Sequence, residues 1–310
     1  MKNKTTKPKF RIRNWAEYNN ALVQRGSLTI WFDQSSVDSW LNAQPSGCRG
    51  KSRKYADAAI LCALTIRQVF HLPLRSTEGL IGSLVQLLEL DLPVMDYSTL
   101  CRRARRLEVK LSAQPVNKIK HLVFDATGLK VYGEGEWKVR LYDAEKRRTW
   151  RKLHISIDAS THQIITALVT DSNIVDPRCL PGQLKQIESR VERVYADGAF
   201  DARICYRAIN QCGARAIIPP RRGSTLWGDD YLKDRNANLR AVRKLGRKRW
   251  KKRVGYHTRS LVETAFFRLK RIFSDKLCSQ RDETQATEVM IRCRALNRMT
   301  ELGMPDSYTV

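Results

Sequence analysis

The chain has 310 residues and a formal net charge of +26, because 57 Lys and Arg stand against 31 Asp and Glu. Such a charge opposes compaction and serves no ordinary small-molecule enzyme. It indicates a polyanionic partner, with nucleic acid first and a ribosomal or generally adhesive basic protein as the alternative. No apolar run approaches the roughly 18 residues of a transmembrane helix, and eight scattered Cys without a CxxC pair argue against a zinc site or a disulfide framework.

The first segment, residues 1–13, is basic and leads into no apolar stretch. It therefore predicts a flexible arm and not a secretory signal. Reduced thiols and a cytoplasmic protein without membrane association are expected. The length predicts about two domains.

The N-terminal region, residues 1–115, is predicted to be all-helical. Apolar residues recur at helical spacing over 55–72. Thr77 is expected to cap a second helix that ends near Leu90. A third helix is predicted from Tyr97 to Leu107, with Asp96 or Ser98 as its cap.

The last two of these helices are joined by a short turn and fit a helix-turn-helix. In that motif the second helix enters the major groove, where Arg side chains reach guanine edges or phosphates. We therefore expect DNA contacts from four residues of the third helix, which are Arg102, Arg103, Arg105 and Arg106. An ordinary helical hairpin with a solvated basic face fits the same pattern.

Beyond residue 115 the pattern changes to short apolar or alternating runs. Three strands in succession are predicted, then helix, strand, helix and strand, over 121–127, 151–159, 162–170, 179–189, 193–198, 201–212 and 214–219. This order predicts an α/β fold with a mixed five-stranded sheet, which is the order of the ribonuclease-H-like fold. Residues 116–310 are predicted to form this catalytic domain, with a basic insertion over 221–255.

Three acids stand out by their position. Asp125 follows an apolar strand, Asp197 ends the fourth strand, and Glu263 lies in the first turns of a helix predicted after the insertion. Strand ends are where α/β folds place their sites. Three carboxylates suit a hard divalent cation, and two such ions can clamp the oxygens of a phosphodiester displacement.

The helix predicted around Glu263 carries further polar residues on the same side. Tyr256, Arg259, Glu263 and Lys270 lie within about 60° of one stripe at 3.6 residues per turn. Arg and Lys suit phosphate oxygens, and a phenol can donate to one. An amphipathic helix with a charged outer face is the alternative interpretation.

The insertion is the most basic part of the chain, with nine Lys or Arg and no acid over 240–253. Such a tract predicts salt-dependent phosphate contacts. Trp227 and Trp250 lie within the insertion, where they fit either packing or stacking on an unpaired base.

These features resemble bacterial insertion-sequence transposases with an Asp-Asp-Glu triad and a Tyr-Arg-Glu-Lys signature, in particular the "insertion sequence five" family. The resemblance covers nearly the whole chain. It rests on LPLRSTEGL, DLPVMDYSTLCRRAR, VFDATGLKVYGEGEWK, KRRTWRKLHISIDASTHQI, YADGAFDAR, AIIPPRR, RNANLRAVRKLGRKRWKK, GYHTRSLVETAFFRLK and ALNRMTELGMP. Residues 140–145 and 274–284 depart from the family pattern.

The resemblance implies a ribonuclease-H-like core in which Asp125, Asp197 and Glu263 are catalytic and bind Mg²⁺, for which Mn²⁺ can substitute. It further implies contacts with transposon-end phosphates from Tyr256, Arg259 and Lys270.

The reaction that the resemblance implies begins with binding of terminal inverted repeats. A two-metal site then hydrolyses the 3′ ends, and the freed 3′-hydroxyl joins target DNA. A homodimer or larger assembly on paired ends is implied, in the bacterial nucleoid. A related nuclease that cuts without joining, and an inactive or domesticated DNA-binding derivative, remain as alternatives.

Overall fold

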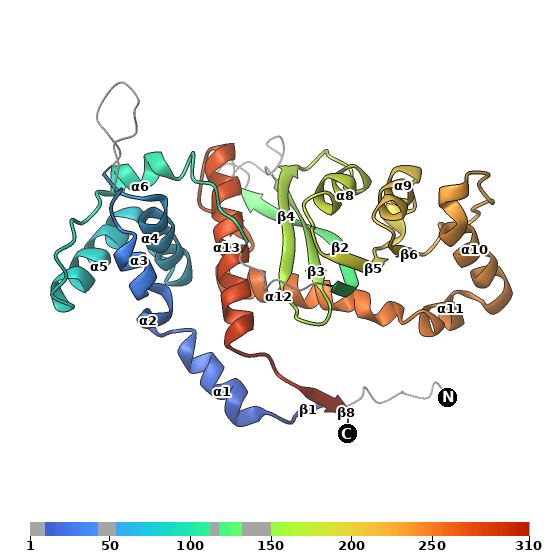
Figure 1. The fold of residues 1–310 in the computed structure, drawn as a ribbon, viewed down its shortest axis with the longest axis horizontal. Coiled ribbons are helices and arrows are strands. Elements are labelled where there is room, and N and C mark those ends of the chain that lie inside the picture. The colour runs from blue at the N-terminus through green and yellow to red at the C-terminus, as the bar shows by residue number, and fades with distance from the viewer. Residues whose placement is uncertain (1–9, 43–53, 112–117, 132–149, 310) are drawn as a thin grey trace, which may run out of the picture.

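A mixed six-stranded sheet lies at the centre of residues 118–309 (Figure 1). The computed structural model describes residues 10–42, 54–111, 118–131 and 150–309. The strands are β2 (Lys118–Val131), β3 (Trp150–Asp158), β4 (Ile164–Asp171), β5 (Arg190–Tyr195), β6 (Arg215–Ile217) and β7 (Lys276–Leu277). Their order is β4-β3-β2-β5-β6, with β7 beside the far end of β2.

Strands β2, β3 and β4 form an antiparallel meander, whereas β5 runs parallel to β2 and β6 parallel to β5. The mixed α/β sheet expected from the sequence is therefore confirmed. The expected number of five strands is corrected, because β7 pairs in parallel with Lys130 and Val131 at the end of β2. A two-residue strand carries no alternation from which a sequence could predict it.

Helices cover both faces of the sheet. On one face lie α8 (Asp176–Leu184) and α9 (Arg203–Gln211), and on the other lie α12 (Ser260–Phe273) and α13 (Asp282–Leu302). Successive side chains of a strand point to opposite faces. Accordingly, Val123 joins the core under α12 and α13, and its neighbours Leu122 and Phe124 join the core under α8 and α9.

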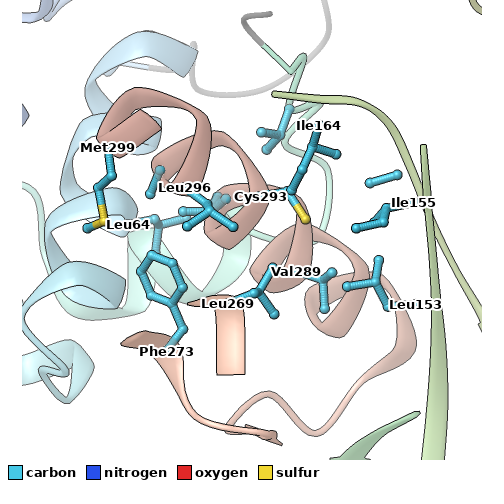
Figure 2. Packing of buried hydrophobic residues seen from close by; sticks show 14 of the residues in the cluster. Leu64, Leu153, Ile155, Ile164, Leu269, Phe273, Val289, Cys293, Leu296 and Met299 are labelled. Carbon is cyan, nitrogen blue, oxygen red and sulfur yellow. The ribbon is translucent and has the colours of Figure 1, made fainter. Parts of the chain in front are cut away.

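The N-terminal region is helical, with α1 (Trp15–Gln24), α2 (Leu28–Trp31), α3 (Gln34–Asp38), α4 (Asp57–Val69), α5 (Leu74–Leu87) and α6 (Tyr97–Arg103). It shares a core with the sheet through α13. Figure 2 shows Leu64 of α4 beside Phe273 and Leu296, while Val289 and Leu153 lie on the sheet side of the same cluster.

Two details of these helices correct the sequence predictions. Helix α5 begins at Leu74 after Pro73, so Thr77 lies inside it, and its hydroxyl donates to the Pro73 carbonyl oxygen at 2.9 Å. A threonine hydroxyl can bond backward within a helix as well as cap one. Helix α6 is capped by Asp96, which accepts from Ser98 N at 2.7 Å, but it ends at Arg103 and not at Leu107.

The two ends of the chain pair with each other. Strand β1 (Phe10–Ile12) runs antiparallel to β8 (Ser307–Thr309), with Phe10 opposite Thr309. The prediction of a free arm over residues 1–13 is therefore wrong for Phe10–Ile12, and residues 1–9 lie outside the described part. Tyr308 also stacks against Arg13, whose guanidinium carbon lies 5.2 Å from the ring centre.

The basic insertion contains regular structure. After the 3-10 turn η2 (Asp230–Leu232) come α10 (Lys233–Leu245) and α11 (Arg247–Arg253). Gly246, with φ of 78°, separates the two helices in a conformation that other residues rarely adopt.

Among the described residues, no single helix is long and apolar enough to cross a membrane; α4 and α5 reach that length only as a pair bent by 113°.

Candidate active site

Asp125 and Asp197 lie at the same level on neighbouring parallel strands. Val123 of β2 is in register with Tyr195 of β5, and each acid stands two residues beyond its member of that pair. Asp125 lies within the long central strand, while Asp197 follows the last residue of β5 and caps the 3-10 turn η1 (Gly198–Phe200) by accepting from Ala199 N at 2.8 Å. The sheet topology therefore brings together two acids that are far apart in the sequence.

Burial raises the pKa of Asp125, and the negative charge of Asp197 contributes to the same shift. The Asp125 side chain is 17% exposed, so it reaches solvent from a mostly dry setting. Burial disfavours the charged form of this carboxylate, and a cation close to it would stabilise that form.

Arg259 joins the third acid to this pair. Its Nη1 donates to Oδ2 of Asp125 at 2.8 Å, and its Nη2 donates to the Glu263 carboxylate one turn further along. Burial works to lower the pKa of Arg259, but the carboxylates of Asp125 and Glu263 more than offset it, and the pKa is raised overall. Arg259 thus bonds to two of the three predicted acids, and Asp197 acts on it only through its charge.

The predicted single helix over the signature residues is corrected in its first turn. Tyr256–Arg259 form the 3-10 helix η3, and α12 begins at Ser260. Gly255, in the left-handed region with φ of 67°, sets the direction of η3.

Tyr256 is fastened to the strand end before Asp197. Its hydroxyl donates to the Ala196 carbonyl oxygen at 3.1 Å, its ring lies 5.8 Å from that of Trp250, and burial raises its pKa to about 12. The phenol therefore stays protonated and links the insertion to β5.

Lys270 is attached to the strand that carries Asp125. Its Nζ donates to Oγ1 of Thr127 at 2.6 Å, and burial lowers its pKa. Thr127 was missed in the sequence, although it stands in the quoted stretch VFDATG, two residues after Asp125 and on the same side of β2.

A hollow of about 460 Å³ opens beside Tyr256, Arg259 and Glu263. It is lined by Lys251, Lys252, Tyr256, His257, Arg259, Ser260 and Glu263. One acid and four basic groups in an open hollow suit a polyanion held next to a cation site.

The donor set fits a divalent metal ion in its chemistry, since carboxylates are the ligands that Mg²⁺ and Mn²⁺ prefer. The guanidinium of Arg259 is the cation that bonds to both Asp125 and Glu263. As the side chains of the described residues stand, no three His, Cys, Asp or Glu are close enough to one another to hold a metal ion.

The two tryptophans of the insertion pack against protein. Trp250 is fully buried, and its Nε1 donates to Asn238 Oδ1 at 3.3 Å. Trp227 stacks against Arg235, whose guanidinium carbon lies 3.5 Å from the ring centre. The packing interpretation is thereby favoured over base stacking for both.

Sequence reasoning also missed a buried ion pair that holds the insertion. Asp201 and Arg235 each have a side chain that is 1% exposed, and Nε of Arg235 donates to Oδ1 of Asp201 at 3.0 Å. Asp201 also accepts from Arg221 N at 2.9 Å, so the first residue of the insertion is anchored beside the loop that follows Asp197. The stretch YADGAFDAR contains Asp201 as well as Asp197, and this second acid is the sequence signal for the buried pair.

The four N-terminal arginines differ in their surroundings. Arg103 is half-buried, donates to the Tyr55 carbonyl oxygen at 2.7 Å and pairs with Asp57. Arg102, at the end of α6, is exposed, and Arg105 and Arg106 are exposed in the turn beyond it. The structure therefore separates Arg103, which holds the helices together, from three arginines that face solvent.

Comparison with known proteins gives two kinds of match. A solved structure, the cryo-EM piggyBac transposase synaptic complex with hairpin DNA, is 9% identical with a TM-score of 0.39, over 89% of this chain and 75% of that chain. Two family models described as "Transposase DDE domain" match residues 23–134 and 117–298, and the second covers more than half of the chain. The chain therefore belongs to the family of proteins with a transposase DDE domain.

Proposed function

We propose that this protein is a DNA transposase of the "insertion sequence five" family that binds terminal inverted repeats, hydrolyses the 3′ ends and joins each 3′-hydroxyl to target DNA. Membership of the transposase DDE family supports DNA transposition as the activity. The observation that carries the proposal is that Asp125 and Asp197 stand at the same level on adjacent strands while Arg259 bonds to Asp125 and Glu263, in a chain of net charge +26.

DDE transposases generally use divalent metal ions. Here Asp125, Asp197 and Glu263 would hold them, with Mg²⁺ as the cofactor and Mn²⁺ as a substitute. Two such ions supply Lewis-acid stabilisation of the attacking and leaving oxygens of a phosphodiester.

The other residues of the site would bind and orient the DNA. Arg259 presents a planar fork suited to a phosphate, and Lys270 presents a point charge 14 positions after Tyr256 on the same side of the site. In the protein without DNA, the guanidinium of Arg259 donates to the carboxylates of Asp125 and Glu263. With a metal ion held by those carboxylates, the guanidinium would be free to bind a phosphate of the transposon end.

Tyr256 takes the place of a positioning residue in this scheme. Its bond to Ala196 fixes the backbone next to Asp197, and its side chain lines the hollow in which the end phosphate would lie.

The helical region over residues 1–115 would bind the repeat through Arg102, Arg105 and Arg106, with residues 116–310 as the catalytic domain. Assembly as a homodimer or larger complex on paired ends in the bacterial nucleoid completes the proposal.

The test uses purified protein, a labelled duplex ending in the terminal repeat of the element, and Mg²⁺. Asp125→Ala, Asp197→Ala and Glu263→Ala should each abolish 3′-end cleavage and leave end binding largely intact. The loss should exceed the roughly 10–100-fold that removal of a supporting contact to a metal ligand costs. Cleavage that persists in all three variants overturns the assignment.

Precut ends separate this function from its rivals. A transposase joins a precut 3′-hydroxyl to plasmid DNA, whereas a nuclease cuts without joining. Wild-type protein that binds the ends but nicks them with neither Mg²⁺ nor Mn²⁺ would instead be an inactive derivative.

A further inference from the structure

A second basic hollow, of about 370 Å³, lies where the C-terminal end of α12 meets the turn between α4 and α5. Arg67, His71 and Pro73 line it from the N-terminal helices, and Ser274, Lys276 and Arg292 line it from the other side. None of the described residues that form its wall is acidic. Residues of the N-terminal helices and of the region around the sheet therefore share one cavity, and its charged lining residues are all basic.

Two arginines in this wall are compensated differently. Arg292 is 2% exposed and has a full set of partners, among them Glu288, Gln68 at 3.0 Å and the Lys276 carbonyl oxygen at 3.0 Å. Arg67 lies close enough to lower the pKa of Arg292, after the larger effect of burial, and the buried Nε of Arg67 has no hydrogen-bond partner. The two guanidinium groups repel each other, and an anion in the hollow would offset that repulsion.

The backbone on both sides of the hollow is strained. His71 has φ of 55° and Ser274 has φ of 72°, in the region that favours glycine. Only four residues other than glycine in the described part of the chain adopt such angles, and two of them line this hollow. At His71 this angle ends α4, where Leu72 N donates to the Arg67 carbonyl oxygen at 2.9 Å, so the turn that carries Arg67 and His71 has a fixed shape.

The distance from the acids to the hollow can be compared with the spacing of phosphates along DNA. From Glu263 to Phe273 α12 rises about 15 Å, at about 1.5 Å per residue. Lys270 lies on this path, and Lys130 pairs with Asp275 at 2.9 Å next to the hollow. The same 15 Å is the rise of four to five base pairs of DNA at about 3.4 Å each.

The path continues on the other side of the hollow. Pro73 also lines a groove between α5 and α6 in which Arg75 stacks on Tyr97, 4.5 Å from the ring centre, beside Arg102. Basic side chains therefore extend from the acids along α12 to the helical hairpin.

We propose that the hollow formed by Arg67, His71, Ser274, Lys276 and Arg292 binds one backbone phosphate of the transposon end, four to five base pairs from the cleaved bond. This inference rests on the proposed function, and it names the surface by which the duplex passes from the catalytic site to α5 and α6. The contact is to the backbone and is independent of sequence, so it sets register and leaves base recognition to the hairpin.

The experiment compares Arg67→Gln/Lys276→Gln with a control that loses charge on the opposite face of the sheet, Lys185→Gln at the exposed end of α8. End binding is measured by fluorescence anisotropy over a series of salt concentrations. The double variant should bind roughly tenfold more weakly. The slope of log K against log salt should fall in magnitude by about one. The control should match wild type.

A second readout locates the contact on the DNA. Neutral methylphosphonates replace the phosphates one at a time along the end. Wild type should lose affinity at the fourth or fifth phosphate from the cleaved bond, and the double variant should be indifferent to that replacement. Equal sensitivity of both proteins at every position overturns the inference.

Thermal unfolding checks that the double variant folds. If it does not, His71→Gln and Lys276→Gln are tested singly, because both side chains lie at the rim. If wild type cuts the ends and the variants bind and cut as well as wild type does, the phosphate contact in the hollow is refuted but the proposed function is not. Wild type that cuts no end refutes the proposed function itself.

Discussion

The guanidinium of Arg259 donates to Oδ2 of Asp125 at 2.8 Å, across 134 positions of sequence, and also to the carboxylate of Glu263. One side chain thus neutralises two of the three acids proposed to hold metal. A metal ion held by these acids would compete with Arg259 for the same oxygens, and this competition can be measured without catalysis.

Arg259→Gln should tighten Mn²⁺ binding in the absence of DNA while weakening binding of the transposon end. A unit charge about 4 Å away contributes a few kcal/mol at an effective dielectric constant of about 20, before solvent screening. An increase in affinity on the order of tenfold is therefore expected. Calorimetric titration with Mn²⁺, followed by anisotropy with DNA, measures the two opposite effects.

Lys270→Gln is the matched control, because it also removes one positive charge but bonds to Thr127 and not to an acid. Arg259→Lys keeps the charge and loses the fork. If Lys270→Gln tightens Mn²⁺ binding as much as Arg259→Gln does, the loss of one positive charge near the site explains the effect. The bonds from Arg259 to Asp125 and Glu263 would then have no specific role in it.

The stability of the fold should fall on acidification below about pH 6.5, partly because of His154. This side chain is 2% exposed, its Nε2 bonds to Thr170 Oγ1 at 2.9 Å, and its Nδ1 lies 3.7 Å from Asp176. Burial lowers its pKa below 6.5, with Lys152 adding to the effect and Asp176 opposing it.

The sign follows from proton binding. Below pH 6.5 the unfolded chain binds a proton at His154 that the folded chain resists. The contribution is therefore complete above 6.5 and is lost as the pH falls through the lowered folded value, by up to about 1.4 kcal/mol per pH unit. Burial likewise lowers the pKa of His121 and His162, so the three effects add.

Urea unfolding between about pH 5 and pH 8 tests this, since His154→Gln should flatten the acid side of the profile. An identical acid slope in wild type and His154→Gln would show that the histidine does not contribute.

The placement of Asp125 and Asp197 on strands of one sheet could be predicted from the sequence. Each acid follows a short apolar run, and the order of strands and helices predicts that both runs belong to the same sheet. The bond from Arg259 to Asp125 could not be predicted. Helical spacing gives the side of η3 and α12 on which Arg259 lies, but not how closely that side approaches β2. The burial of Trp250 could not be predicted either. Its sequence neighbours include nine basic residues, which are typical of a surface segment, yet its side chain lies in the core.

The four N-terminal arginines should divide into one that stabilises the fold and three that bind DNA. Arg103→Gln removes the contacts to Asp57 and the Tyr55 carbonyl oxygen, and should lower the free energy of unfolding by about 1 kcal/mol. Once folded, it should bind the transposon end with nearly wild-type affinity.

Arg102→Gln, Arg105→Gln and Arg106→Gln should behave in the opposite way. Exposed substitutions of this kind change stability by less than about 0.5 kcal/mol. Each should reduce the salt slope of end binding by about one. Salt slopes that do not change in any of the three place the DNA elsewhere and leave α6 as a solvated basic face.

The buried pair of Asp201 and Arg235 should be needed for both stability and cleavage. Asp201→Asn leaves the guanidinium of Arg235 in a site where it is 1% exposed and without its counter-charge. Loss of one partner of such a pair costs about 3–5 kcal/mol. Asp201 also accepts from Arg221 N, and Arg221 donates to the Ala199 carbonyl oxygen at 3.1 Å, so the loop after Asp197 should loosen as well.

The control is Asp229→Asn, which breaks the pair with Arg203 at the surface. Those side chains are 40% and 54% exposed, and pairs of this kind contribute at most about 1 kcal/mol. Urea unfolding gives both free energies, and cleavage is measured on the folded fraction at saturating DNA. A lower cleavage rate in folded Asp201→Asn, with wild-type cleavage in Asp229→Asn, would show that the pair positions Asp197. Equal cleavage in both would limit Asp201 to a stabilising role, because the strand end would then hold Asp197 without help from the insertion.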